Sequence, residues 1–196
     1  MPTMENRAPV AEECDQISAQ SLVERLVREH RRWRSQDFPL IAHLFDEIQH
    51  TDGAEPPCVA PLRKAFYRLY AEMEGHMTRE EHVLFPAILD AQGVIPRNGQ
   101  SFGSIQNPIA MMEQEHDWEA ARLEKMRSIA QDYQLPENAH EKLRLLFRQL
   151  EALEASLHSH TFLESSILFA QALATEKTHI SPARRTEPGP RIETQG

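Results

Sequence analysis

Histidines that lie on apolar helical stripes constrain the fold of this chain more than any other feature. Apolar residues that recur at steps of three and four mark the buried face of a helix. Four segments show such a stripe, each stripe includes a histidine, and in two of them a glutamate follows four residues later on the same face. The residues concerned are His30, His76, Glu80, His116, His160 and Glu164. We therefore expect all six side chains to enter one interior.

The four stripes predict an all-α fold, an antiparallel four-helix bundle. The predicted helices cover about residues 21–49, 61–92, 106–133 and 136–175. A capping box formed by Ser21 and Glu24 is expected to start the first helix, and Pro39 is expected to kink it. Pro136 is expected to open the last helix. The short connections make consecutive helices antiparallel neighbours.

The bundle is expected to fill most of the chain. Residues 1–17 lack periodicity and form a flexible lead-in, and residues 18–175 form the bundle. Residues 176–196 contain proline, glycine and charged residues without an apolar face, which predicts a disordered tail.

The two stripe glutamates require a positive partner, because a buried carboxylate without one costs several kcal/mol. No lysine or arginine shares their stripes nearby, so a bound metal ion is the simplest source of positive charge. The His-x-x-x-Glu spacing places an imidazole and a carboxylate one turn apart, about 6 Å along the axis. Two such pairs from facing helices could surround two metal ions. Imidazole and carboxylate without thiolate suit iron, and also manganese or zinc.

A purely structural explanation accounts for single residues but not for the set. One histidine on an apolar stripe is more often a core residue than a ligand, and one His-x-x-x-Glu pair is common on helix surfaces. Four stripe histidines combined with two such pairs favour a metal site. The histidines expected at the surface or in the tail are His43, His82, His140 and His179, and His158 is expected off the ligand face, either beside the ligands or facing solvent.

Composition argues against several classes of function. The formal net charge is −9 and there is no basic block, which argues against nucleic-acid binding. No apolar run approaches the roughly 18 residues of a membrane span, and the polar, acidic N-terminus does not resemble a signal peptide. The two cysteines, Cys14 and Cys58, form neither a disulfide framework nor a metal motif. We therefore expect a cytoplasmic protein without a membrane partner.

Three stretches of the chain resemble the hemerythrin-like di-iron family. They are EMEGHMTREEHVLFPAIL at 72–89, NPIAMMEQEHDWE at 107–119 and LHSHTFLESSILFAQAL at 157–173, with LVREHRRWRSQDFP at 26–39 as a weaker match. The closest similarity is to the bacterial branch of the family that is implicated in nitric-oxide response and in repair of iron–sulfur centres. The resemblance implies two iron ions per chain, bridged by carboxylates.

The resemblance also implies roles for individual residues. It implies terminal ligands at His76 and His160, bridging carboxylates at Glu80 and Glu164, and further ligands at His30 and His116. The family also has a histidine at the far end of its first helix, for which His50 is the candidate. His50 follows His30 by twenty residues, which is about 200° around an ideal helix. Glu72 and Glu115 match acidic residues near the family's site.

These features predict a non-haem di-iron protein that binds a small diatomic ligand, nitric oxide ahead of dioxygen, in stress response or buffering. Three alternatives stay open: iron donation to damaged iron–sulfur centres with an iron–sulfur protein as partner, an oxygen carrier or sensor, and a di-iron oxidase or peroxidase. Repair proteins of this type commonly carry a cysteine-containing N-terminal domain, whereas this chain has a lead-in with Cys14. That difference favours a ligand-binding protein over an iron donor or a dedicated enzyme.

Overall fold

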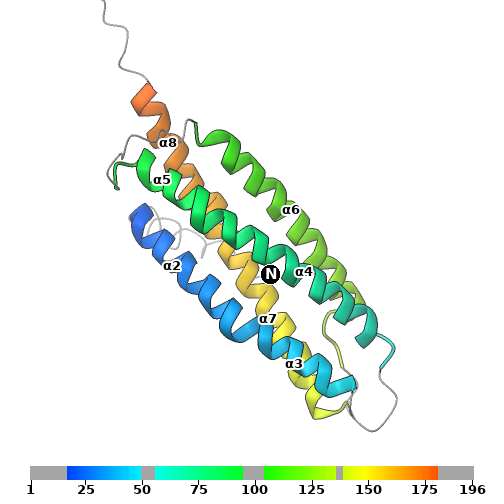
Figure 1. The fold of residues 1–196 in the computed structure, drawn as a ribbon. Coiled ribbons are helices and arrows are strands. Elements are labelled where there is room, and N and C mark those ends of the chain that lie inside the picture. Colours follow the sequence, from blue (N-terminus) through cyan, green and yellow to red (C-terminus); the bar gives the residue numbers. More distant parts are fainter. Residues whose placement is uncertain (1–16, 50–55, 95–103, 136–138, 181–196) are drawn as a thin grey trace, which may run out of the picture.

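Four helical rods, each antiparallel to its neighbours, make up the fold (Figure 1). The computed structural model describes residues 17–49, 56–94, 104–135 and 139–180. Rod A comprises α2 (Ala19–Arg32), η1 (Trp33–Asp37) and α3 (Phe38–Gln49), and rod B comprises α4 (Val59–Arg79), η2 (Glu80–Leu84) and α5 (Phe85–Ala91). Rod C is α6 (Gln106–Ile129). Rod D comprises α7 (Glu141–Leu163), η3 (Glu164–Leu168) and α8 (Phe169–Ile180). The predicted all-α four-helix bundle is confirmed, and the described ranges contain no strand.

The rods follow one another around the bundle in chain order. Rod A packs against rods B and D, and rod C packs against the same two rods. Short connections favour this arrangement, because each rod returns beside the one before it. Within the described ranges, no helix combines the length and the apolar character that a bilayer crossing requires.

Three of the rods contain a π-helical turn, labelled η1, η2 and η3. Each turn is closed by a phenylalanine whose N–H donates to the carbonyl five residues earlier: Phe38 to Trp33, Phe85 to Glu80 and Phe169 to Glu164. Such turns are rare and occur frequently at functional sites. Here two of the three begin at a stripe glutamate.

Proline accompanies two of the π turns. Pro39 and Pro86 directly follow Phe38 and Phe85, so the kink predicted at Pro39 coincides with a π turn. A wider turn accommodates the missing N–H and the bulk of the proline ring. Ala170 stands at the same position in rod D, where the turn also forms, so proline is not required for it.

Two predicted helix starts were wrong. Rod A begins at Ala19, because the hydroxyl of Ser18 caps it by accepting from the Ser21 N–H at 3.2 Å; the predicted cap, Ser21, lies inside the first turn. Rod D begins at Glu141, where the His140 side chain accepts from the Lys142 N–H. Pro136, the predicted start of rod D, lies outside the described residues.

Two predicted helix ends also shift. The α6 helix stops at Ile129, short of the predicted 133, and is followed by three residues with left-handed φ values of 50° to 57°. Rod D continues to Ile180, five residues beyond the predicted end. Glu176, placed by prediction in the tail, accepts a hydrogen bond from the Ile105 N–H at 2.9 Å and so ties rod D to rod C.

The apolar core is divided in two by a polar layer. One cluster of buried side chains includes Trp33, Met73 and Leu157, and the other includes Leu26, Leu84, Met112 and Leu163. Between them along each rod lie the stripe histidines and glutamates. The bundle therefore buries charge-bearing groups at mid-height, between two apolar halves.

Candidate metal centre

The six stripe residues meet in the polar layer, and we refer to them as the central cluster. Its members are His30, His76, Glu80, His116, His160 and Glu164, each no more than 6% exposed. Two groups within it could each hold a metal ion: His76, Glu80, His116 and Glu164, and His30, Glu80 and His160. Glu80 belongs to both groups.

Glu80 spans the two groups with its two carboxylate oxygens. Its Oε1 lies 3.0 Å from Nε2 of His76, and its Oε2 lies 3.3 Å from Nε2 of His30. On the other side of the cluster, Oε2 of Glu164 lies 3.2 Å from Nε2 of His116 and 3.6 Å from Nε2 of His160. Each glutamate therefore faces histidines from two rods, but only Glu80 offers ligand atoms to both groups.

Each imidazole of the cluster has a hydrogen-bond partner behind it, on the neighbouring rod. Nδ1 of His30 contacts Glu81 at 2.8 Å, Nδ1 of His76 contacts Glu115 at 2.9 Å, Nδ1 of His116 contacts Ser165 at 3.2 Å, and Nδ1 of His160 contacts Glu29 at 3.0 Å. The four bonds run from rod A to B, B to C, C to D and D back to A. They form a closed ring around the cluster.

These bonds fix the tautomers of the imidazoles. An ionised carboxylate only accepts hydrogen bonds, so Nδ1 of His30, His76 and His160 carries the proton and donates it. When the imidazole is neutral, Nε2 then presents a lone pair to the interior. Such an outer carboxylate is the usual support of a metal-bound histidine.

The inward-facing atoms fit a cation and have little else to bind. Six buried polar atoms of the described residues have no hydrogen-bond partner: Nε2 of His76 and His116 and all four carboxylate oxygens of Glu80 and Glu164. Nε2 of His30 and Nε2 of His160 lie 3.2 Å apart, two lone pairs facing each other. Buried polar groups are normally paired, so this donor set fits metal ions well.

Arginines keep the outer carboxylates ionised. Arg79 donates to Glu115 at 2.7 Å, and Arg34 donates to Glu81 at 2.6 Å. The pKa of Glu115 is lowered chiefly by its bond from His76, with Arg79 adding to the effect. Burial opposes this at Glu81, but its bonds from His30 and Arg34 still lower its pKa. The outer shell therefore stays charged and holds the imidazoles in place.

Inside the cluster, burial and the charges of neighbouring residues shift the pKa values of the individual groups in different directions. Burial raises the pKa of Glu164 far above its usual range, and the charge of Glu80 adds to this. Burial also disfavours a charged Glu80, but the attraction of His76 outweighs it and lowers the pKa of Glu80. At His76, burial lowers the pKa, but the charge of Glu80 and the hydrogen bond to Glu115 outweigh burial and raise the pKa to about 10. Without metal, His76 therefore holds an extra proton at neutral pH, and burial favours the protonated form of Glu164.

Metal binding should therefore release protons. A ligating imidazole is neutral and a ligating carboxylate is ionised, so His76 must lose its extra proton and Glu164 must be ionised when metal binds. Iron affinity should therefore rise with pH toward the pKa of His76, about 10, and fall in acid. Titrating the metal-free protein with Fe²⁺ in two buffers of different ionisation enthalpy would count the protons. An affinity independent of pH over this range would contradict the burial of these charges.

Aromatic side chains pack against the imidazoles at the π turns. Phe85, which closes the turn that begins at Glu80, stacks on His30 with ring centroids 6.0 Å apart. Phe169, which closes the turn that begins at Glu164, stacks on His116 at 6.1 Å. Both segments follow the pattern His-x-x-x-Glu-x-x-x-x-Phe, so rods B and D contribute equivalent units to the site.

The other predicted residues fall into three groups. The histidines expected at the surface and described by the structure are exposed, as predicted: His43, His82 and His140. His158 is exposed too, which selects the solvent-facing one of its two expected positions. His50 and the side chain of His179 lie outside the described residues. Glu115 contacts the cluster through His76, whereas Glu72 pairs with Arg68 and Arg122 and contacts none of its histidines.

Sequence reasoning missed four polar residues around the cluster. Three are the outer partners Glu29, Glu81 and Ser165, each of which is adjacent in sequence to a cluster residue. That adjacency was the available signal. The fourth is Glu119, three residues after His116 and only 7% exposed. A step of three keeps a side chain near the same helix face, but the stripe continues equally well through Ala120.

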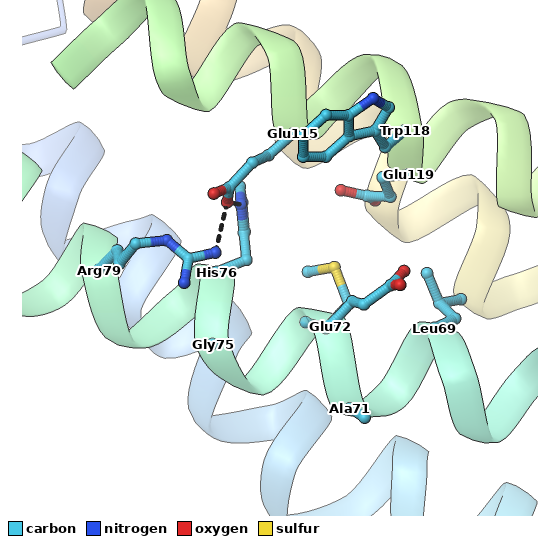
Figure 2. Close-up of a pocket in the computed structure, with 10 residues that line it drawn as sticks. Leu69, Ala71, Glu72, Gly75, His76, Arg79, Glu115, Trp118 and Glu119 are labelled. Atoms are coloured by element: carbon cyan, nitrogen blue, oxygen red, sulfur yellow. Dashed lines mark hydrogen bonds and ion pairs between the residues drawn. The ribbon is translucent and has the colours of Figure 1, made fainter. Parts of the chain in front are cut away.

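A pocket of about 310 Å³ leads from the surface to the cluster between α4 and α6 (Figure 2). Its lining includes Trp118, which is 56% exposed, and the buried His76. Glu72, Glu115 and Glu119 also line it. The His76 side of the cluster is therefore the side that an ion or small molecule can reach from this pocket.

Comparison with known families agrees with this geometry. The model of the hemerythrin HHE cation-binding domain matches residues 21–172. The chain belongs to the hemerythrin family. The matched range covers most of each of the four rods and every residue of the central cluster. The resemblance drawn from the sequence is confirmed, and the family description agrees with a cluster that fits cations.

Two similar proteins are both iron–sulfur cluster repair proteins, the branch of the family that the sequence resembles most. The iron–sulfur cluster repair protein YtfE of Yersinia pseudotuberculosis serotype IB (strain PB1/+) is 31% identical over 149 residues, and that of Yersinia pestis (strain Pestoides F) is 30% identical over 149 residues. Each alignment covers 76% of this chain and 63% of the relative. The chain thus spans less than two thirds of the length of these relatives.

Proposed function

We propose that the central cluster holds two iron ions, one in each of the two groups of residues described above, with Glu80 shared between them. The proposal is supported by the orphaned nitrogen and oxygen atoms that converge there and by membership of a cation-binding family. Imidazole with carboxylate, and without thiolate, is a donor set that suits iron.

The ligand set leaves room for an external ligand. The Nε2 atoms of four imidazoles and the four oxygens of two carboxylates offer eight ligand atoms, fewer than the roughly twelve that two octahedral ions take. Bound iron would supply redox chemistry and open coordination positions. The chain's own residues orient the imidazoles through the outer carboxylates, and the apolar halves above and below exclude bulk water.

From this site we infer that the protein supplies iron for the repair of damaged iron–sulfur centres. The observation that carries the inference is similarity to YtfE repair proteins over 149 residues, or 76% of this chain. The pocket beside His76 supports it, because iron that is donated must be able to leave. The sequence alone ranked this role behind nitric-oxide binding, and the similarity to repair proteins supports placing it first.

Nitric-oxide binding remains a second candidate, favoured by the apolar surroundings of the cluster. Met73, Met112 and Leu157 are each at most 3% exposed and lie one turn from cluster histidines along their rods. Apolar surroundings with open coordination positions favour a small neutral molecule over a bulky polar substrate. A protein that repairs nitric-oxide damage could combine both properties.

Iron transfer tests the leading proposal. The iron-loaded protein would be incubated without oxygen with a dehydratase whose iron–sulfur cluster has lost iron. Recovery of dehydratase activity, in proportion to iron lost from this protein, is the expected result. The metal-free protein and an equal concentration of free Fe²⁺ with chelator are the controls. No recovery beyond that of the controls would reject the repair function.

Gas binding tests the second candidate. The reduced, iron-loaded protein is expected to bind nitric oxide with a stable change in its visible spectrum, and to be oxidised in air without a persistent oxygen complex. Stopped-flow mixing with each gas separates the outcomes. A long-lived oxygen complex would instead make the protein an oxygen carrier or sensor.

Histidine substitutions should distinguish the histidines that bind metal from those that do not. His76→Ala, His116→Ala and His160→Ala are each expected to lower iron content from about two ions per chain to about one or fewer. His43→Ala and His158→Ala change exposed residues and should leave it unchanged. Iron analysis after gel filtration makes the comparison. The same assay on His50→Ala tests the remaining predicted ligand, since full retention would remove His50 from the set.

A further inference from the structure

Glu119 is a buried carboxylate that the cluster does not use. It lies on α6, one turn beyond His116, is 7% exposed and lines the pocket beside His76. Among the described residues, no hydrogen bond or ion pair involves its side chain. Figure 2 shows its carboxylate directed into the space between α6 and α4, on the side where His76 and Glu115 lie.

The other acids of the pocket are already neutralised. Glu72 is bound by Arg68 and Arg122, and Glu115 is bound by Arg79 and His76. Glu119 thus differs from both in forming no ion pair with an arginine or a histidine among the described residues. Burial, aided by the charge of Glu80 and opposed by that of His76, raises the pKa of Glu119 to about 7. A carboxylate in this position favours either a proton or a metal cation.

We propose that Glu119 is a metal-binding residue whose carboxylate holds ferrous iron in the pocket, outside His76, as the ion passes between solvent and the central cluster. The pocket connects the exposed Trp118 to His76, so an ion that takes this route passes Glu119. Glu119 is not part of either group of converging ligand atoms. An ion held by Glu119 would therefore occupy a position outside the two metal positions of the central cluster. The inference rests on the proposed iron site.

Iron exchange measures the role of Glu119 directly. Wild type, Glu119→Gln and Glu113→Gln would be loaded anaerobically with Fe²⁺ and mixed with excess ferrous chelator in a stopped-flow instrument. Glu113 is the matched control, because it is an exposed glutamate on the same helix. We expect all three proteins to start with the same iron content. Glu119→Gln should release the iron on the His76 side about tenfold more slowly or slower still, and Glu113→Gln should match wild type.

Two results would overturn the proposal. Equal release rates in Glu119→Gln and wild type would show that iron does not use this carboxylate. Loss of one iron from Glu119→Gln before chelator is added would make Glu119 an inner ligand and not an outer one. Thermal melting of the metal-free variants tests folding separately, and Glu119→Gln should be at least as stable as wild type because it removes a buried charge.

The measurement is independent of the repair function. The chelator accepts iron whatever the natural recipient is, so a wild-type protein that fails to repair a dehydratase can still show slowed release in Glu119→Gln. Conversely, a protein that repairs the dehydratase while Glu119→Gln releases iron normally would retain the repair function and reject the role of Glu119.

Discussion

Glu80→Ala is expected to remove both metal ions, the largest effect of any single substitution in the central cluster. Its two carboxylate oxygens lie within 3.3 Å of Nε2 of His76 and of His30, which belong to different metal groups. Alanine removes the shared ligand from both groups, which leaves His30 and His160 in one group and His76, His116 and Glu164 in the other. Iron content should fall from about two ions per chain to near zero.

Elemental analysis of anaerobically reconstituted protein tests this expectation. Glu164→Ala is the informative comparison, because Glu164 belongs only to the group with His76 and His116, and it should retain about one ion. Glu113→Gln controls for the loss of an exposed charge. A wild type that takes up at most one metal, or that prefers zinc strongly, would reject the di-iron assignment. Two ions retained by Glu80→Ala would reject the shared ligand.

Removing the metal should lower the melting temperature by about 10 °C or more. Loss of the partner of a buried charge costs about 3–5 kcal/mol, and each kcal/mol shifts the melting temperature of a domain of this size by about 2–4 °C. Without metal, the polar layer carries facing lone pairs and two close carboxylates between two apolar halves. Without the metal, no ion connects the rods between the two apolar clusters.

Calorimetry of metal-free and iron-loaded protein at the same pH checks this result. We expect a lower and broader transition for the metal-free form, because the two apolar clusters can then unfold less cooperatively. Glu80→Ala without metal isolates the contribution of the buried charge, since it removes one of the two carboxylates. Coincident transitions for the metal-free and loaded proteins would contradict a buried metal site.

The fold and the six cluster residues could be predicted because both follow from one periodicity. Steps of three and four assign a face to each residue, and His76 and Glu80 stand out as polar residues on a face that is otherwise apolar. The partner of each histidine could not be predicted in this way. Glu81 is adjacent to Glu80 in sequence but binds His30 on another rod, and a single sequence does not specify which rods are neighbours.

Local details were missed for a different reason. Ser18 and Ser21 are both acceptable caps, and only the hydrogen bond from the Ser21 N–H to Ser18 distinguishes them. The π turns change the helical phase by one residue, which a stripe with a fixed period does not reveal. Glu119 was overlooked because the apolar stripe of α6 can be continued from His116 either by a step of three, to Glu119, or by a step of four, to Ala120. The step to the apolar Ala120 was chosen.

The ring of four imidazole hydrogen bonds also determines how far each rod is advanced along its neighbours. Apolar stripes repeat with every turn, so a rod that slid by one turn, about 5.4 Å, would still present an apolar face to the core. The ring has no such repeat. Sliding rod A by one turn would break the bond that His30 donates to Glu81 and the bond that Glu29 accepts from His160. The same holds for every rod, so the polar layer selects a single axial register among those that the apolar pattern allows.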